Sequence, residues 1–165
     1  ILELAEYADK FGIRIAVENM NDYAVAPKRK FCADPEELVA FVDDFNDPRI
    51  GICWDFEHGE IMEQDQPAAL RRIGKRLIAT HVSDSNDKKA EHLIHMLPYT
   101  GFMQWEDNMR ALAEIGYDGD FSYEVHNYAN RIPDGLLPAA LRYAVEVGEY
   151  LLGLAQTTDG GGVNG

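Results

Sequence analysis

The chain has 165 residues and a formal net charge of −14, from 15 Lys and Arg against 29 Asp and Glu. Because a negative field of this size repels phosphate backbones, we expect no nucleic acid as a partner. With 46% hydrophobic residues the chain can bury one core, and it has no apolar run of about 18 residues that would predict a membrane span.

The sequence opens at Ile1 inside a helical pattern, and it is shorter than the roughly 250 residues of an eight-stranded barrel. We therefore expect residues 1–154 to form the back half of a longer α/β fold and residues 155–165 to be a disordered tail. Cys32 and Cys53 show no paired spacing, which indicates a reducing, cytoplasmic location, and Cys53 is expected in the core.

Helical and strand patterns alternate along the whole chain, with turn residues between them. Helices are expected near residues 4–12, 34–45, 67–74, 105–115 and 136–154, and strands at residues 13–18, 50–54, 77–80 and 121–125. The intervening loops 19–33, 55–66 and 82–103 are long, which is typical of functional loops. This alternation fits a parallel barrel or a doubly wound sheet.

An acidic or imidazole residue lies at the carboxyl end of each expected strand or within one residue of it: Glu18, Asp55, His81 and Glu124. A carboxylate at the end of a buried strand is costly unless something there needs it. Barrel closure would aim all four side chains at one centre, which favours the barrel over the open sheet. Three oxygen donors and one imidazole suit a divalent ion such as Mn²⁺ or Mg²⁺.

Other polar residues near these strand ends have both a functional and an ordinary interpretation. His58, three residues after Asp55, is either a substrate or metal partner or a solvated loop residue, and Asp84 could orient His81 as a hydrogen-bond acceptor. The remaining candidates lie in or beside loops, where solvated side chains are common: His92, His95, His126, Lys88 and Lys89.

Five segments together resemble the sugar phosphate isomerase/epimerase superfamily, the xylose isomerase-like TIM barrel group. They are AVEN, the D-x-x-H of Asp55 and His58, HVSD, the H-x-L-P-x-x-G of His95 to Gly101, and IGYDGDFSYEV. The resemblance implies the C-terminal half of a (β/α)8 TIM barrel, with about four βα units corresponding to strands 5–8.

In epimerases of this superfamily a Glu, Asp, His, Glu quartet binds one divalent metal. The resemblance implies that role for Glu18, Asp55, His81 and Glu124, with Mn²⁺ or Mg²⁺ expected and Co²⁺ or Zn²⁺ as alternatives. Glu18 and Glu124 would also be the catalytic base and acid, and His58 and His95 would bind a small sugar or polyol-type substrate.

Two departures from the superfamily narrow the class of reaction. The loop after His81 reads SDSNDKK and lacks the arginine that ketose 3-epimerases carry there. The residues ahead of the Leu-Pro segment do not supply the Asp-x-His pair of the endonuclease branch, so a three-metal DNA-repair site is not expected.

Three hypotheses remain. The first is a metal-dependent isomerase or epimerase that abstracts a proton and passes through a metal-bound enediolate. The second is a dehydratase (lyase) of an inosose-like substrate, which uses the same abstraction and then expels a hydroxyl. The third is an inactive half barrel, whose exposed edge strands would pair with a second copy or with its missing half.

Overall fold

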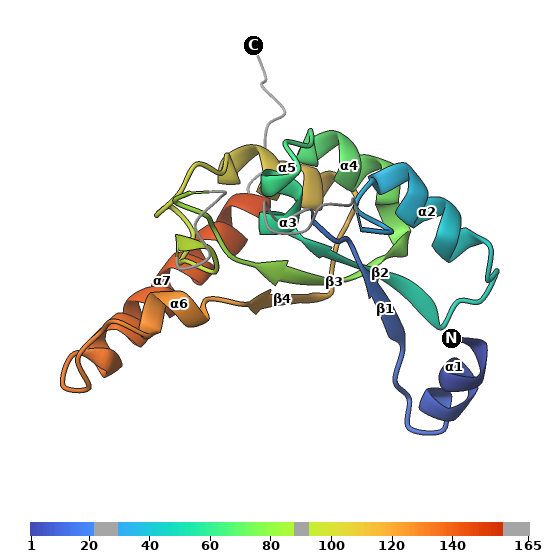
Figure 1. The fold of residues 1–165 in the computed structure, drawn as a ribbon, viewed down its shortest axis with the longest axis horizontal. Coiled ribbons are helices and arrows are strands. Elements are labelled where there is room, and N and C mark those ends of the chain that lie inside the picture. Colours follow the sequence, from blue (N-terminus) through green and yellow to red (C-terminus); the bar gives the residue numbers. More distant parts are fainter. Residues whose placement is uncertain (22–29, 88–92, 157–165) are drawn as a thin grey trace, which may run out of the picture.

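The computed structural model describes residues 1–21, 30–87 and 93–156. Its helices and strands alternate as the sequence patterns predict, and Figure 1 shows their arrangement. In chain order they are α1 (Leu2–Asp9), β1 (Ile15–Glu18), α2 (Pro35–Asp43), β2 (Ile50–Asp55), α3 (Phe56–Ile61), α4 (Gln66–Ile73), the 3₁₀ turn η1 (Gly74–Arg76), β3 (Leu77–Val82), α5 (Trp105–Glu114), β4 (Asp120–Tyr123), α6 (His126–Ala129) and α7 (Leu137–Gln156).

The four strands form one parallel sheet in the order β1-β2-β3-β4. Helices α2, α3, α4 and α5 lie along one face of it (Figure 1). The register places Asp55 of β2 directly opposite His81 of β3, so the carboxyl ends of neighbouring strands meet at one edge. The expected α/β half barrel is therefore confirmed.

The core lies between the sheet and these helices, with α7 contributing buried residues, and strand β2 is its centre because all six of its residues are buried. Trp54 is fully buried and donates a hydrogen bond from Nε1 to Gln66 Oε1 (3.1 Å). Cys53 is buried in the same strand, as expected. A continuous apolar run of this kind is the pattern of a strand covered on both faces.

Helix α2 begins where the sequence predicts, because Asp34 accepts hydrogen bonds from the backbone N–H groups of Glu36 (2.9 Å) and Glu37 (3.1 Å). Its inner face is formed by Leu38, Val39 and Val42, which are buried. Phe41 and Phe45 are only half-buried, and their rings pack edge-on in a row with the exposed ring of Phe31.

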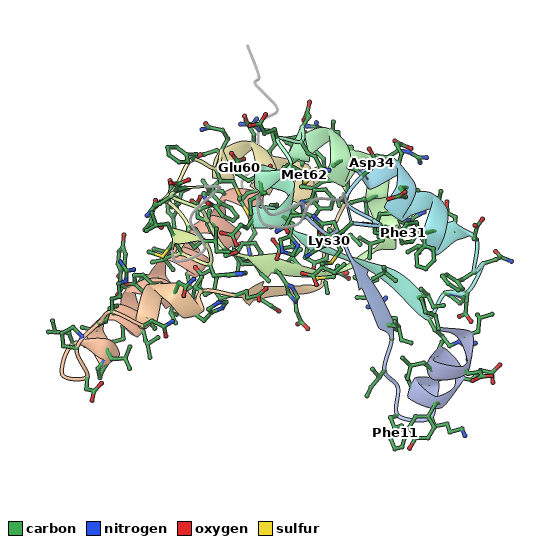
Figure 2. All side chains as sticks on the ribbon, viewed as in Figure 1. Phe11, Lys30, Phe31, Asp34, Glu60 and Met62 are labelled. Carbon is green, nitrogen blue, oxygen red and sulfur yellow. The ribbon has the colours of Figure 1, made fainter. Side chains whose placement is uncertain are left out.

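The ends of the described chain leave large apolar side chains exposed. Phe11, at the outer tip of the α1 region in Figure 2, exposes 65% of its surface. Helix α1 ends at Asp9, earlier than expected, and Gly12 (φ +66°) turns the chain before β1 begins at Ile15. Strands β1 and β4 form the two edges of the sheet in the described part.

Two short helices were not predicted. Helix α3 occupies part of the expected 55–66 loop, and α6 follows β4. With six and four residues, these helices are too short to show the apolar periodicity that predicts a helix. Helix α7 extends to Gln156, two residues into the expected tail, and residues 157–165 lie outside the described residues. Across the described ranges, every helix is too short or too polar to cross a bilayer.

Candidate metal and active site

Four side chains converge at the carboxyl edge of the sheet: Glu18, Asp55, His81 and Glu124. One ligand-type atom from each lies within 4.8 Å of those of the other three. His81 is central, with Nδ1 at 3.0 Å from Glu18 Oε1 and 3.4 Å from Glu124 Oε2. Since the side chains come from the ends of four consecutive strands, the parallel register assembles the set, which we call the quartet.

Asp55 is the most buried member of the quartet, with none of its surface exposed. Its Oδ1 accepts a hydrogen bond from the backbone N–H of His58 (2.8 Å), which caps helix α3. Its Oδ2 has no hydrogen-bond partner among the described residues. Burial raises the pKa of Asp55 to about 6, against the opposing effect of His58. A buried carboxylate with a free oxygen is suited to a cation.

Asn19, which sequence reasoning missed, holds the backbone of Asp55 in place. Its side chain accepts from the Asp55 N–H (2.6 Å) and donates to the Asp55 carbonyl oxygen (2.9 Å). These two hydrogen bonds connect the ends of β1 and β2 beside the quartet. The only sequence signal is an amide residue directly after the strand-ending Glu18.

His58 lies at the wall of the site, and its side chain exposes 10% of its surface. Its Nδ1 lies 2.7 Å from the Asn19 carbonyl oxygen and 3.7 Å from Glu18 Oε1. Because a carbonyl oxygen can only accept, Nδ1 is the donor in this contact, and in the neutral ring Nε2 is then an acceptor. The structure therefore brings His58 to the quartet, as the sequence analysis expects.

Glu57, between two candidate site residues in the sequence, is also fully buried and was missed. Its Oε1 accepts a hydrogen bond from the backbone N–H of His95 (2.8 Å), and its Oε2 lies 3.3 Å from His95 Nδ1. Burial raises the pKa of Glu57 to about 8. A glutamate in the first turn of a helix is common at the surface, so the sequence gives no sign of this burial.

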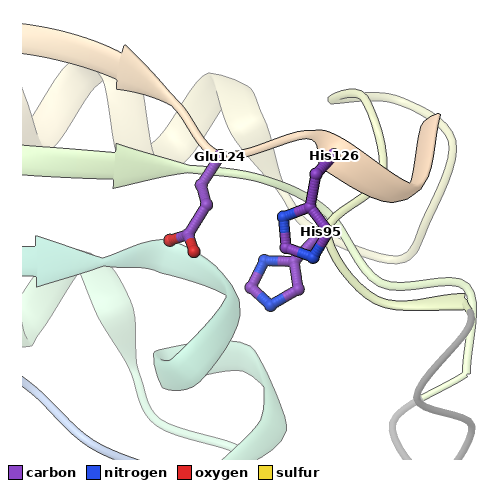
Figure 3. Close-up of side chains that lie close together, drawn as sticks. All are labelled: His95, Glu124 and His126. Carbon is purple, nitrogen blue, oxygen red and sulfur yellow. The ribbon is translucent and has the colours of Figure 1, made fainter. Parts of the chain in front are cut away.

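His95 and His126 are adjacent in space, with ring centroids 4.3 Å apart and an angle of 32° between the ring planes. Both lie close to Glu124 (Figure 3). The structure thus brings His95 to the edge of the quartet, whereas His92, Lys88 and Lys89 lie outside the described residues.

Asp84 does not orient His81, contrary to the sequence expectation. It is fully buried and accepts hydrogen bonds from the N–H groups of Ser85 (2.9 Å) and Tyr99 (3.1 Å) and from Trp105 Nε1 (3.0 Å). Its backbone pairs with that of Met96 as an isolated antiparallel bridge. Asp84 therefore fixes the loop that carries His95 rather than a quartet residue.

The fixed loop explains Gly101, the last residue of the H-x-L-P-x-x-G segment. A Cβ placed there would collide with Asp84 Oδ1 and with the Ser85 carbonyl oxygen. We expect Gly101→Ala to lower the free energy of unfolding by about 1–3 kcal/mol, measured by chemical denaturation. Gly135→Ala is the matched control, because its Cβ would meet nothing within 4 Å. Equal stability of the two variants would contradict this packing.

Comparison with known proteins identifies the family. Residues 1–147 match the family described as xylose isomerase-like TIM barrel, and the chain belongs to it. An uncharacterized protein of Methanocaldococcus jannaschii is 31% identical over 134 residues, which are 79% of this chain and 43% of that protein. A D-psicose 3-epimerase of Enterocloster bolteae is 26% identical over 117 residues, or 71% of this chain and 35% of that enzyme.

Solved structures agree on the fold. A xylose isomerase domain protein of Alicyclobacillus acidocaldarius superimposes with a TM-score of 0.71 at 21% identity, covering 88% of this chain and 53% of that one. The chain thus spans about half of that protein and less than half of the curated relatives it matches. The match to about half of that structure agrees with the sheet of this chain, which has four strands in the described residues where a complete barrel has eight.

Proposed function

We propose that the protein is a divalent-metal-dependent isomerase or epimerase acting on a sugar or a related hydroxy-carbonyl compound. The observation that carries the proposal is the quartet, in which three carboxylates and one imidazole converge at the carboxyl edge of a parallel sheet. The similarity to a D-psicose 3-epimerase and to a ketose 3-epimerase of Arthrobacter globiformis supports the reaction class.

The quartet fits a divalent cation on two grounds. Its donor set of three carboxylates and one imidazole suits Mn²⁺ or Mg²⁺, with Co²⁺ or Zn²⁺ as alternatives. The buried Asp55 Oδ2 lacks a hydrogen-bond partner in the described part of the chain, so a cation would supply the missing contact. A bound divalent ion stabilises negative charge that develops on the substrate oxygens.

Glu18 and Glu124 are proposed to move the proton. The two carboxylates approach His81 Nδ1 from different strands, β1 and the end of β4, at opposite edges of the sheet. One removes the proton from the substrate carbon next to the carbonyl, and the other returns a proton to that carbon. Delivery from the opposite side inverts the centre, which is the chemistry of an epimerase.

His58 and His95 are proposed to bind the substrate. His58 uses Nδ1 on the Asn19 carbonyl, so Nε2 can accept a hydrogen bond from a substrate hydroxyl. His95 lies beside Glu124, on the side of the quartet away from β1, and could contact a more distant hydroxyl. Together they would set which carbon of the sugar faces the two glutamates.

Product analysis on the full-length protein tests this proposal. Incubation with ketoses and inososes should give isomeric sugars detectable by NMR, and activity should be lost on chelation and restored by Mn²⁺ or Mg²⁺. Full activity after complete removal of metal would contradict the proposal. An unsaturated ketone as the product would identify a dehydratase instead.

Pairing through the sheet edges stays a prediction. Strands β1 and β4 are only partly buried, and exposed apolar residues lie on the flanking helices α1 and α7, such as Leu4 and Leu141. These edges would pair with a second copy or with another half barrel. Light scattering of the 165-residue chain tests this, because a compact monomer would argue against pairing.

A further inference from the structure

We propose that His95, Glu124 and His126 form a second cation site beside the quartet, suited to Zn²⁺ or Co²⁺. One ligand-type atom from each of the three lies within 4.8 Å of the others. This second set shares Glu124 with the quartet and otherwise uses different residues. Figure 3 shows Glu124 at the end of β4, with the two imidazoles close together beside it.

The spacing is close to what one ion requires. Metal–ligand distances at zinc are about 2.0–2.2 Å, so two ligand atoms of the same ion lie at most about 4 Å apart. Small side-chain rotations would bring atoms within 4.8 Å to that spacing. The rings of His95 and His126 already lie with centroids 4.3 Å apart, so neither ring has to cross the site.

The two histidines are held together by contacts of their neighbours in the sequence. Asn127 Nδ2 donates a hydrogen bond to the Ile94 carbonyl oxygen (2.9 Å), which ties α6 to the segment that carries His95. His95 itself has a positive φ of 53°, unusual for a residue with a side chain. Backbone strain of this kind persists where surrounding contacts impose it.

A buried carboxylate faces the ring of His95, and this points independently to a ligand. Glu57 is fully buried, and its Oε2 lies 3.3 Å from His95 Nδ1, yet neither atom has a hydrogen-bond partner in the described residues. Metal-binding histidines commonly give their second ring nitrogen to a carboxylate. A hydrogen bond from His95 Nδ1 to Glu57 would satisfy both buried atoms and leave Nε2 for the cation, so that His95 would reach the substrate through the bound ion.

The two sets differ in chemistry, so they should prefer different ions. The second set has two imidazoles and one carboxylate, a donor combination found at catalytic zinc sites, which leave one position open for water or substrate. The quartet has three carboxylates and one imidazole, which favours Mn²⁺ or Mg²⁺. A carboxylate shared between two ions, as Glu124 would be, is suited to a two-metal centre that binds neighbouring substrate oxygens.

Ion binding tests the inference without reference to turnover. The metal-free full-length protein is titrated with Co²⁺, followed by visible absorption, and separately with Mn²⁺, followed by electron paramagnetic resonance. We expect two Co²⁺ ions per chain. His126→Gln should weaken one Co²⁺ site by about 100-fold and leave Mn²⁺ binding unchanged, because a ligand of the second set alone is lost.

His81→Gln is the matched variant, because it removes one imidazole from the quartet alone. It should weaken Mn²⁺ binding and leave the Co²⁺ site of the second set in place. His126 is exposed, so His126→Gln should retain the fold, which circular dichroism checks. One Co²⁺ per chain, or two whose affinities His126→Gln leaves unchanged, would overturn the second site. A wild-type protein that binds Co²⁺ at the second set but does not bind Mn²⁺ at the quartet would count against the proposed function instead.

Discussion

Replacing Glu124 with glutamine in the full-length protein should lower kcat by about 10²–10⁴-fold, even at saturating Mn²⁺. Glutamine has nearly the same shape but can neither take up nor release the proton, so positioned acid–base catalysis is lost. The carboxylate of Glu124 lies 3.4 Å from His81 and belongs to both candidate cation sets. Steady-state assay of the identified sugar substrate measures the effect.

Glu149→Gln is the matched control, because Glu149 is an exposed glutamate on α7, outside the site. It should retain wild-type turnover. Solvent deuterium exchange separates the roles of the two glutamates. If Glu18 alone still removes the proton, the Glu124→Gln variant should slowly exchange that substrate proton for solvent deuterium without forming the epimer. A Glu124→Gln enzyme that turns over like the wild type would remove Glu124 from the mechanism.

Asp55→Asn should weaken binding of Mn²⁺ by at least about 100-fold, while the metal-free protein keeps its stability. The carboxylate is fully buried with Oδ2 unpartnered in the described residues, so its charge is unfavourable unless a cation is present. An asparagine oxygen can still accept the hydrogen bond from the His58 N–H that caps α3. Calorimetric titration with Mn²⁺ and thermal unfolding without metal measure the two effects.

The control is Asp134→Asn, at an exposed aspartate ahead of α7, which should change neither quantity. Wild-type Mn²⁺ affinity in Asp55→Asn would show that the ion binds without this carboxylate. A large loss of stability in the metal-free variant would instead indicate that Asp55 has a structural role.

The sequence predicted the parallel α/β framework because its signals are local and strong. The run that ends in Asp55 is apolar throughout, and β2 is buried at every position. The start of α2 is determined locally as well, since the capping side chain of Asp34 and the first-turn proline Pro35 act within a few residues. Parallel register then brings strand ends together, so the convergence of the quartet followed from the fold.

Residues whose role depends on distant contacts could not be found in this way. Glu57 is fully buried only because α3 packs its first turn against the segment that carries His95, 38 positions later in the chain. Asp84 pairs with Met96 and Trp105 rather than with His81, because the segment that carries Met96 lies antiparallel to Asp84. Tertiary contacts of this kind leave no periodic pattern in the sequence.

The short helix α3 was missed for a related reason. Its residues Phe56–Ile61 include a glycine, which is unfavourable in a helix, and six residues are too few to show apolar periodicity. The Asp55 cap and the packing of Phe56 against Trp105 (ring centroids 5.3 Å apart) stabilise the helix instead. Both contacts depend on the arrangement of the strand end that precedes it.

A crystal of the full-length protein soaked in Mn²⁺, with data collected near the manganese absorption edge, tests the proposed metal site most directly. We expect a strong anomalous peak within coordination distance of Glu18, Asp55, His81 and Glu124. A soaked crystal with no peak among these four side chains, or with manganese bound only elsewhere, would contradict it.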